Sequence, residues 1–153
     1  MKKYDRANIV VLIFSGIITI SALSLAVLIV DNPDGYFLSI PVLIALIGSA
    51  TSIILNILWK MDISKSIVAY IISYILSVIL AICSWISFND KLMVATPIIL
   101  FVISTLLIIM TNNNIKSRII LILANPMLYY SIFMIFIMVE FSKHSWNGWN
   151  LEP

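Results

Sequence analysis

The run NIVVLIFSGIITISALSLAVLIV, at residues Asn8–Val30, contains no charged side chain over 23 positions. A helix needs about 20 mainly apolar residues to cross the hydrocarbon core of a bilayer. The apolar region of a secretory signal peptide is shorter, about 7–15 residues. We therefore expect an uncleaved transmembrane helix here and not a targeting segment.

Four more apolar runs follow, and short connectors separate them. The chain is 62% hydrophobic and 10% charged, whereas an average soluble domain is about 45–50% apolar and about 25% charged. The sequence therefore predicts an all-α, polytopic integral membrane helical bundle, a single transmembrane domain over residues 1–153 with no soluble domain. The five expected transmembrane helices and the Trp-rich tail are 8–30, 38–59, 67–88, 94–110, 119–141 and 142–153.

The basic residues indicate the orientation of these spans. With five spans and a cytoplasmic N-terminus, segments 1–7, 60–66 and 111–118 lie inside and hold seven of the nine Lys and Arg residues. Cytoplasmic loops carry such an excess of cations. We therefore expect a cytoplasmic N-terminus and an external C-terminus. The alternative has four spans, with 94–110 re-entrant and the C-terminus inside.

Small residues recur every four positions along the third expected helix. A face of this kind lets two membrane helices approach closely, and serine hydroxyl groups can hydrogen-bond across the contact. Two interpretations remain open at this point: packing inside one chain, and an interface between copies of the chain. The residues of this small-residue face are Ala69, Ser73, Ser77, Ala81 and Ser84.

Three polar residues within the spans are expected to bond between helices. Asn56 lies near the inner end of the second span, where an amide facing lipid would be costly. Asn125 precedes Pro126, and a proline removes a backbone donor and kinks or breaks a helix. Tyr129 is four positions after Asn125, on the same helical face. We expect a kink at Pro126 and hydrogen bonds from Asn125 and Tyr129 to another helix.

Glu140 is the one acidic residue inside a predicted span. His144 follows it by four positions, a pairing distance on a helix. The pair has two interpretations: an ion pair at the membrane interface, or a sensing group in which His144 titrates near neutral pH.

The sequence offers no other chemistry. It has one cysteine, Cys83, one histidine, and no glycine-rich phosphate loop. We predict no catalytic, cofactor-binding or metal-binding residues, and no cofactor. A net charge of +2 is too small to indicate nucleic-acid binding. We expect a protein that is not an enzyme and whose surroundings are membrane lipid.

Three functions fit this description. The first is a non-enzymatic, homo-oligomeric subunit of the bacterial inner membrane that senses, anchors or scaffolds a partner protein docked on the cytoplasmic loops 60–66 and 111–118. In size, span density and composition the chain is similar to the membrane subunits of phage-defence pairs such as Kiwa and of bacteriocin-immunity operons. The alternatives are a homo-oligomeric pore or channel, and a small transporter or flippase component for an apolar substrate.

Overall fold

In a computed structural model of the chain, every described element is a helix. The structure describes residues 6–31, 36, 38–59, 62–86 and 90–148, without the side chains of 84–86, 90–94, 141 and 143–148. The elements in chain order are α1 (Arg6–Val30), α2 (Ser39–Trp59), the short 3₁₀ helix η2 (Ser64–Ser66), α3 (Ile67–Ile86), α4 (Asp90–Thr111), α5 (Ile115–Leu123) and α6 (Pro126–Gly148).

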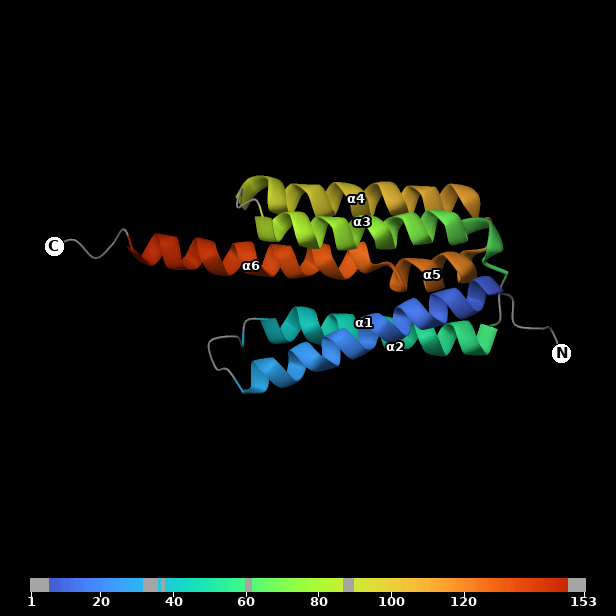
Figure 1. Ribbon diagram of the computed structural model, residues 1–153, viewed down its shortest axis with the longest axis horizontal. Coiled ribbons are helices and arrows are strands. Elements are labelled where there is room, and N and C mark those ends of the chain that lie inside the picture. The colour runs from blue at the N-terminus through green and yellow to red at the C-terminus, as the bar shows by residue number, and fades with distance from the viewer. Residues whose placement is uncertain (1–5, 32–35, 37, 60–61, 87–89, 149–153) are drawn as a thin grey trace.

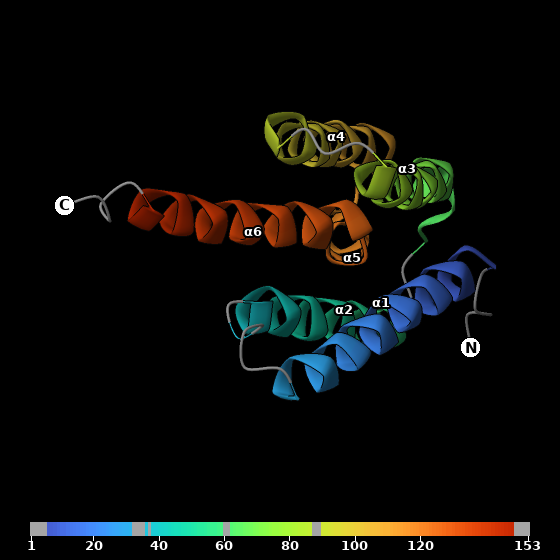
Figure 2. The same ribbon diagram turned by 60° about the vertical axis from the view of Figure 1, so that its left-hand side comes forward.

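The helices form two groups that lie face to face (Figure 1). One group is the antiparallel pair α1 and α2, and the other consists of α3, α4 and α6. The turned view of Figure 2 shows α1 and α2 set apart from α3 and α4 along most of their length. Helix α5 contacts both α2 and α4, so it joins the two groups.

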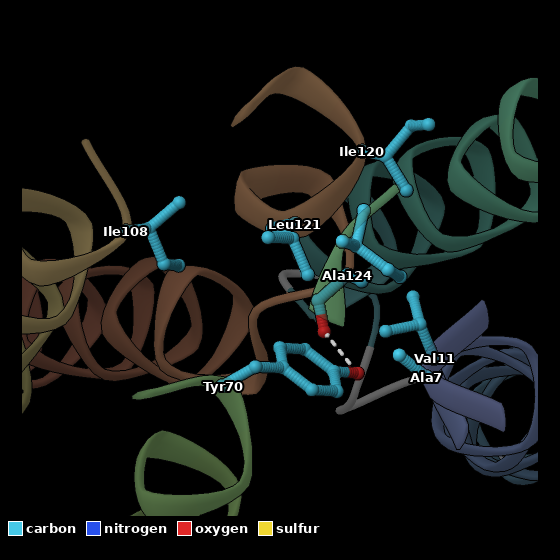
Figure 3. Packing of buried hydrophobic residues seen from close by; sticks show 8 residues of the cluster. Ala7, Val11, Tyr70, Ile108, Ile120, Leu121 and Ala124 are labelled. Atoms are coloured by element: carbon cyan, nitrogen blue, oxygen red, sulfur yellow. Dashed lines mark hydrogen bonds between the residues drawn. The ribbon is translucent and has the colours of Figure 1, made fainter. Parts of the chain in front are cut away.

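The main core lies at one end of the bundle, where α1 begins and where α5 and η2 lie (Figures 1 and 3). Side chains from α1, α3, α4 and α5 meet there and exclude solvent. Burying a large aliphatic side chain is worth roughly 1.5–3 kcal/mol, so this cluster contributes substantially to the stability of the fold. The buried members are Ala7, Val11, Ile63, Tyr70, Ile108, Ile120, Leu121 and Ala124.

The outward faces of the helices are apolar. Ile20, Val30 and Met110 are 65%, 71% and 79% exposed, and many other large aliphatic residues share this exposure. Apolar surface left in water costs roughly 25 cal/mol per Å², whereas lipid chains accept it. The helical backbone also satisfies its own hydrogen bonds, as a lipid environment requires. The fold is therefore that of an all-α membrane-spanning protein.

The number of spans differs from the expected five. By length and composition, α1, α2 and the η2–α3 segment are long and apolar enough to cross a membrane, and α5 with α6 adds a fourth only if the bent pair is one span. The described apolar part of α4, Ala95–Thr111, is shorter than a span needs. Helix α4 as a whole runs from Asp90 to Thr111, and the side chains of 90–94 lie outside the described residues.

The predicted loop 111–118 is mostly helical, which corrects our expectation. Only 112–114 separates α4 from α5. The Asn114 side chain accepts a hydrogen bond from the Lys116 backbone N–H at 2.9 Å, and this N-cap starts α5 early. Arg118 donates to the carbonyl groups of Asn112 and Ile109, at 2.5 and 2.9 Å, and so caps the end of α4. Polar side chains therefore end α4 and begin α5, with only three residues between the two helices.

The fifth expected span, 119–141, is two helices with a bend of 48° between them, α5 and α6. A kink was expected at Pro126, and the structure has one there. Helix α6 continues to Gly148, so the first part of the predicted tail 142–153 is helical, and 149–153 lies outside the described residues.

Candidate functional site: an apolar cleft beside a broken helix

The break between α5 and α6 is built from Asn125 and Pro126. Pro126 has no backbone N–H and begins α6 as its first residue, a position that proline tolerates well. The Asn125 Oδ1 atom accepts from the Met127 N–H at 3.0 Å, and its Nδ2 group donates to the Ser104 hydroxyl on α4 at 2.8 Å. Asn125 therefore caps α6 and ties the break to the second helix group.

Side-chain hydroxyl groups from three helices satisfy carbonyl groups at the break. Ser52 of α2 donates to the Ile120 carbonyl at 3.1 Å. Tyr70 of α3 donates to the Ala124 carbonyl at 3.0 Å, the bond drawn in Figure 3. Tyr129 of α6 donates to the Leu123 carbonyl. Non-helical backbone at membrane depth is tolerated where protein buries and satisfies it, and these hydroxyl groups supply that condition.

The break has a consequence for α6. Helix α5 is held against α2, and the chain then bends by 48°. Helix α6 therefore runs mainly along α4, and it also contacts α2 and α3 (Figures 1 and 2). The two groups therefore enclose a cleft of about 430 Å³ beyond the break. Its walls are Ile17, Ile18, Ser21, Ala22 and Leu25 of α1, Pro41, Val42 and Ala45 of α2, Tyr74, Ser77, Val78 and Ala81 of α3, and Pro126, Tyr129, Tyr130 and Phe133 of α6.

These walls are almost wholly apolar, and no charged residue is among the lining residues. The polar side chains among the lining residues carry hydroxyl groups, for example Ser21, Tyr74 and Ser77. The Tyr74 ring stacks on Phe14 with 4.2 Å between ring centroids, which fixes its direction. Ligand pockets have this character: apolar walls with a small number of placed polar groups, in about 300–1,000 Å³.

Tyr129, which lines the cleft, packs closely against Gly48 of α2. A Cβ atom placed on Gly48 would lie 2.3 Å from the Tyr129 hydroxyl oxygen and 3.0 Å from two ring carbons. Only glycine therefore permits this approach of α6 to α2. The contact and the Tyr129–Leu123 hydrogen bond together hold the ring at the point where the helices diverge.

The small-residue face lies inside the chain. Ser73 and Ser77 are 2% and 8% exposed, and Ala69 and Ala81 are half-buried. The Ser84 side chain lies outside the described residues. Ser73 and Ser77 donate to carbonyl groups of their own helix, at 2.9 and 2.7 Å. Within one chain, these serine side chains are therefore covered and hydrogen-bonded.

A polar seam runs between α1 and α2. The hydroxyl oxygens of Ser15 and Ser52 are 3.4 Å apart, and those of Thr19 and Ser49 are 2.8 Å apart. Asn56 is fully buried and donates from Nδ2 to the Asn8 carbonyl at 3.1 Å. The Oδ1 atoms of Asn8 and Asn56 are buried without a hydrogen-bond partner.

Glu140 and His144 are not among the residues that line this cleft. Glu140 is half-buried toward the C-terminal end of α6 and has a partner within the chain. The His144 side chain lies outside the described residues, so the predicted pair has no geometry here. Among the described residues, no group of three or more His, Cys, Asp or Glu side chains is placed to hold a metal ion.

Two cations of segment 111–118 make contacts inside the chain. The Lys116 ammonium lies 5.4 Å from the centre of the Trp59 ring, a cation–π contact. Arg118 caps α4.

Comparison with known proteins found no matching family model, no matching curated protein and no matching solved structure.

The cleft was missed by reasoning from the sequence. Its walls come from four helices, and its position depends on the angle at which α6 leaves α5. Asn125-Pro126 was the available signal, since a break inside an apolar span often lies next to a binding site. Tyr70 and Gly48 carried no signal of their own, because a tyrosine and a glycine in an apolar helix are common in membrane proteins.

Proposed function

We propose that this protein is a non-enzymatic, multi-pass membrane subunit that acts by binding. It recognises an apolar molecule within the bilayer and anchors or scaffolds a partner protein in response. The observation that supports this proposal is the cleft of about 430 Å³, whose apolar walls lie between membrane-spanning helices. Such walls provide apolar contacts and hydroxyl groups that can recognise a ligand. We therefore propose that the site binds a molecule and catalyses no reaction.

We also propose that the N-terminus lies in the cytoplasm and that α4 spans the membrane. Helix α4 is continuous from Asp90 to Thr111 and runs beside α3 without reversing, unlike a re-entrant segment (Figure 1). Arg6, Lys65, Lys116 and Arg118 come from distant parts of the sequence, yet their segments gather at one end of the bundle (Figure 1). A cluster of cations at one end supports a cytoplasmic location for it.

Reporter fusions test this topology. Alkaline phosphatase, which is active outside, and green fluorescent protein, which is fluorescent inside, are each fused after residues 59, 111 and 153. Five spans with a cytoplasmic N-terminus predict inside signals after residues 59 and 111, and an outside signal after residue 153. An inside signal after residue 153 would instead support an even number of spans.

The partner is proposed to dock at the same cytoplasmic end. Ser64 and Lys65 are exposed there, in a turn that the Asp62 side chain holds through bonds to the Ser64 N–H and hydroxyl at 3.0 and 2.5 Å. A preformed turn costs less ordering on binding than a flexible loop. Of the two predicted docking segments, 60–66 therefore has the better support.

A pull-down tests the central proposal. The tagged protein is extracted from its native membrane in mild detergent, and native mass spectrometry gives the stoichiometry. We expect a stoichiometric protein partner whose retention falls when Lys65 is replaced by glutamate, with Lys116→Glu as the comparison. Purification of this chain alone, with no partner in any detergent, would contradict the proposal. Homo-oligomers with ion flux in liposomes would favour a pore.

A second function, a component of a transporter or flippase for an apolar substrate, is favoured by the broken helix. Discontinuous helices near the bilayer midplane form binding sites in secondary transporters. Here the break adjoins the cleft, because Pro126 and Tyr129 are lining residues. Movement of a fluorescent lipid between leaflets of liposomes that contain the protein would support this second function.

A further inference from the structure

The location of the cleft restricts what can enter it. Three of its walls are α1, α2 and α3, which are long and apolar enough to span a membrane, and the lining residues come from their middle and outer parts. At that depth the surrounding solvent is lipid hydrocarbon. A ligand therefore reaches the cleft from the bilayer and must itself partition there.

The size of the cleft selects a slender molecule. One turn of an α-helix with side chains is about 10–12 Å wide and about 5.4 Å long, which is on the order of 500 Å³. The cleft of about 430 Å³ is of that order, so it would hold no more than about one turn of a helix. A single flexible chain can follow the space between the two helix groups.

The chemistry of the lining restricts the polar end of the ligand. A phosphate or carboxylate inside the cleft would meet no cation among the lining residues, and an unpaired charge in such surroundings is very costly. Hydroxyl groups are present instead. Ser77 donates its proton to the Tyr74 carbonyl, so its oxygen remains able to accept a hydrogen bond. Tyr74, on the same helix, is also a lining residue and carries a second hydroxyl group.

We propose that the cleft binds an uncharged single-chain lipid that carries a hydroxyl group, the class of long-chain and isoprenoid alcohols. The chain lies along α1, α2 and α6, and the hydroxyl group bonds to Tyr74 and Ser77 on α3. This inference rests on the proposed function, and it adds the class of molecule that the site recognises.

Photolabelling tests the proposal with the whole protein in lipid nanodiscs. The probes are hexadecanol and hexadecanoate, each with the same diazirine in the chain, and mass spectrometry locates the label. We expect hexadecanol to label cleft peptides at least about tenfold more than hexadecanoate at pH 8, because a factor of ten corresponds to only 1.4 kcal/mol and burial of a carboxylate costs more.

Two substitutions on one helix give a matched control. Ala45 lines the cleft, and Ala50, on the same helix, is not a lining residue. Ala45→Trp should fill the cleft and remove most of the labelling, while Ala50→Trp should leave it unchanged. If Ala45→Trp does not fold, Ala81→Trp fills the cleft from α3 instead.

Three results would overturn the inference: equal labelling of the two Trp variants, label found only outside the cleft, or equal labelling by the two probes. Failure here leaves the proposed function standing if the pull-down still yields a stoichiometric partner. Conversely, specific labelling of the cleft, without a partner protein in the pull-down, would contradict the scaffold function and support the ligand-binding inference.

Discussion

Replacement of Gly48 by alanine tests whether the contact with Tyr129 sets the packing of α6 on α2. The new Cβ would lie 2.3 Å from the Tyr129 hydroxyl oxygen and 3.0 Å from Cε1 and Cζ, so the ring must move by about an ångström. That movement strains the packing, at a typical cost of about 1–3 kcal/mol. It also pulls the hydroxyl group away from the Leu123 carbonyl, and a hydrogen bond contributes about 0.5–1.5 kcal/mol.

Alanine also has a better helix propensity than glycine by about 0.8–1.0 kcal/mol. The net expectation for Gly48→Ala is therefore a loss of about 1–3 kcal/mol in the free energy of unfolding. Gly16 on α1 is the matched control, because a Cβ there would meet nothing within 4 Å. Gly16→Ala should be neutral or stabilising by up to about 1 kcal/mol.

The assay is unfolding of the purified protein by SDS in mixed micelles, followed by circular dichroism. Adding Tyr129→Phe to Gly48→Ala removes the oxygen that lies closest to the new methyl group, so the double variant should lose less than the sum of the two single losses. If Gly48→Ala is as stable as Gly16→Ala, the ring does not sit on Gly48 and the description of this contact is wrong.

Three further expectations use the same protein. Tyr70→Phe leaves the Ala124 carbonyl at the break without its side-chain donor, and we expect a loss of about 1–3 kcal/mol in the SDS assay; unchanged stability would mean that the bond is not formed. Asn56→Leu should alter stability by less than about 1 kcal/mol, since the amide already has an unpaired oxygen, whereas Asn56→Asp buries a charge and should lose more than about 3 kcal/mol. In a Cys83→Ser background, the Ser77→Cys variant should give no disulfide-linked dimer on non-reducing gels after oxidation, because position 77 is only 8% exposed within one chain. The unsubstituted protein, with its exposed Cys83, provides the comparison. A dimer linked through position 77 would restore the oligomer interpretation.

Local features of the chain were largely predictable. Helix α1 differs from its expected range only at the N-terminal end, and α2 starts one residue later than expected. The bend at Pro126 was predictable because a proline lacks the N–H group that a continuous helix requires. The start of α5 was not, because it depends on the Asn114 N-cap and on Arg118, which bonds back to α4.

The candidate site could be predicted from the sequence less completely than the helices. The buried position of Asn56 and its bond to another helix follow from the cost of an amide in lipid. The two interpretations of the Ser73–Ser77 face could not be separated, because a stripe of small residues has the same spacing whichever helix covers it. Lys116 and Arg118 were assigned to a loop, and their contacts with Trp59 and α4 depend on how the helices meet.

The sequence by itself determined that this is a membrane protein of apolar helices, and where most of those helices run. Run length and the need for internal backbone hydrogen bonds act within each segment, so they can be read one segment at a time. The tertiary structure alone decided that α5 stays with α2 while α6 runs mainly with α4, and hence that a cleft exists. Such a cleft depends on the angle of one break and on contacts between residues far apart in the chain, among them Ser52 with Ile120 and Tyr129 with Gly48.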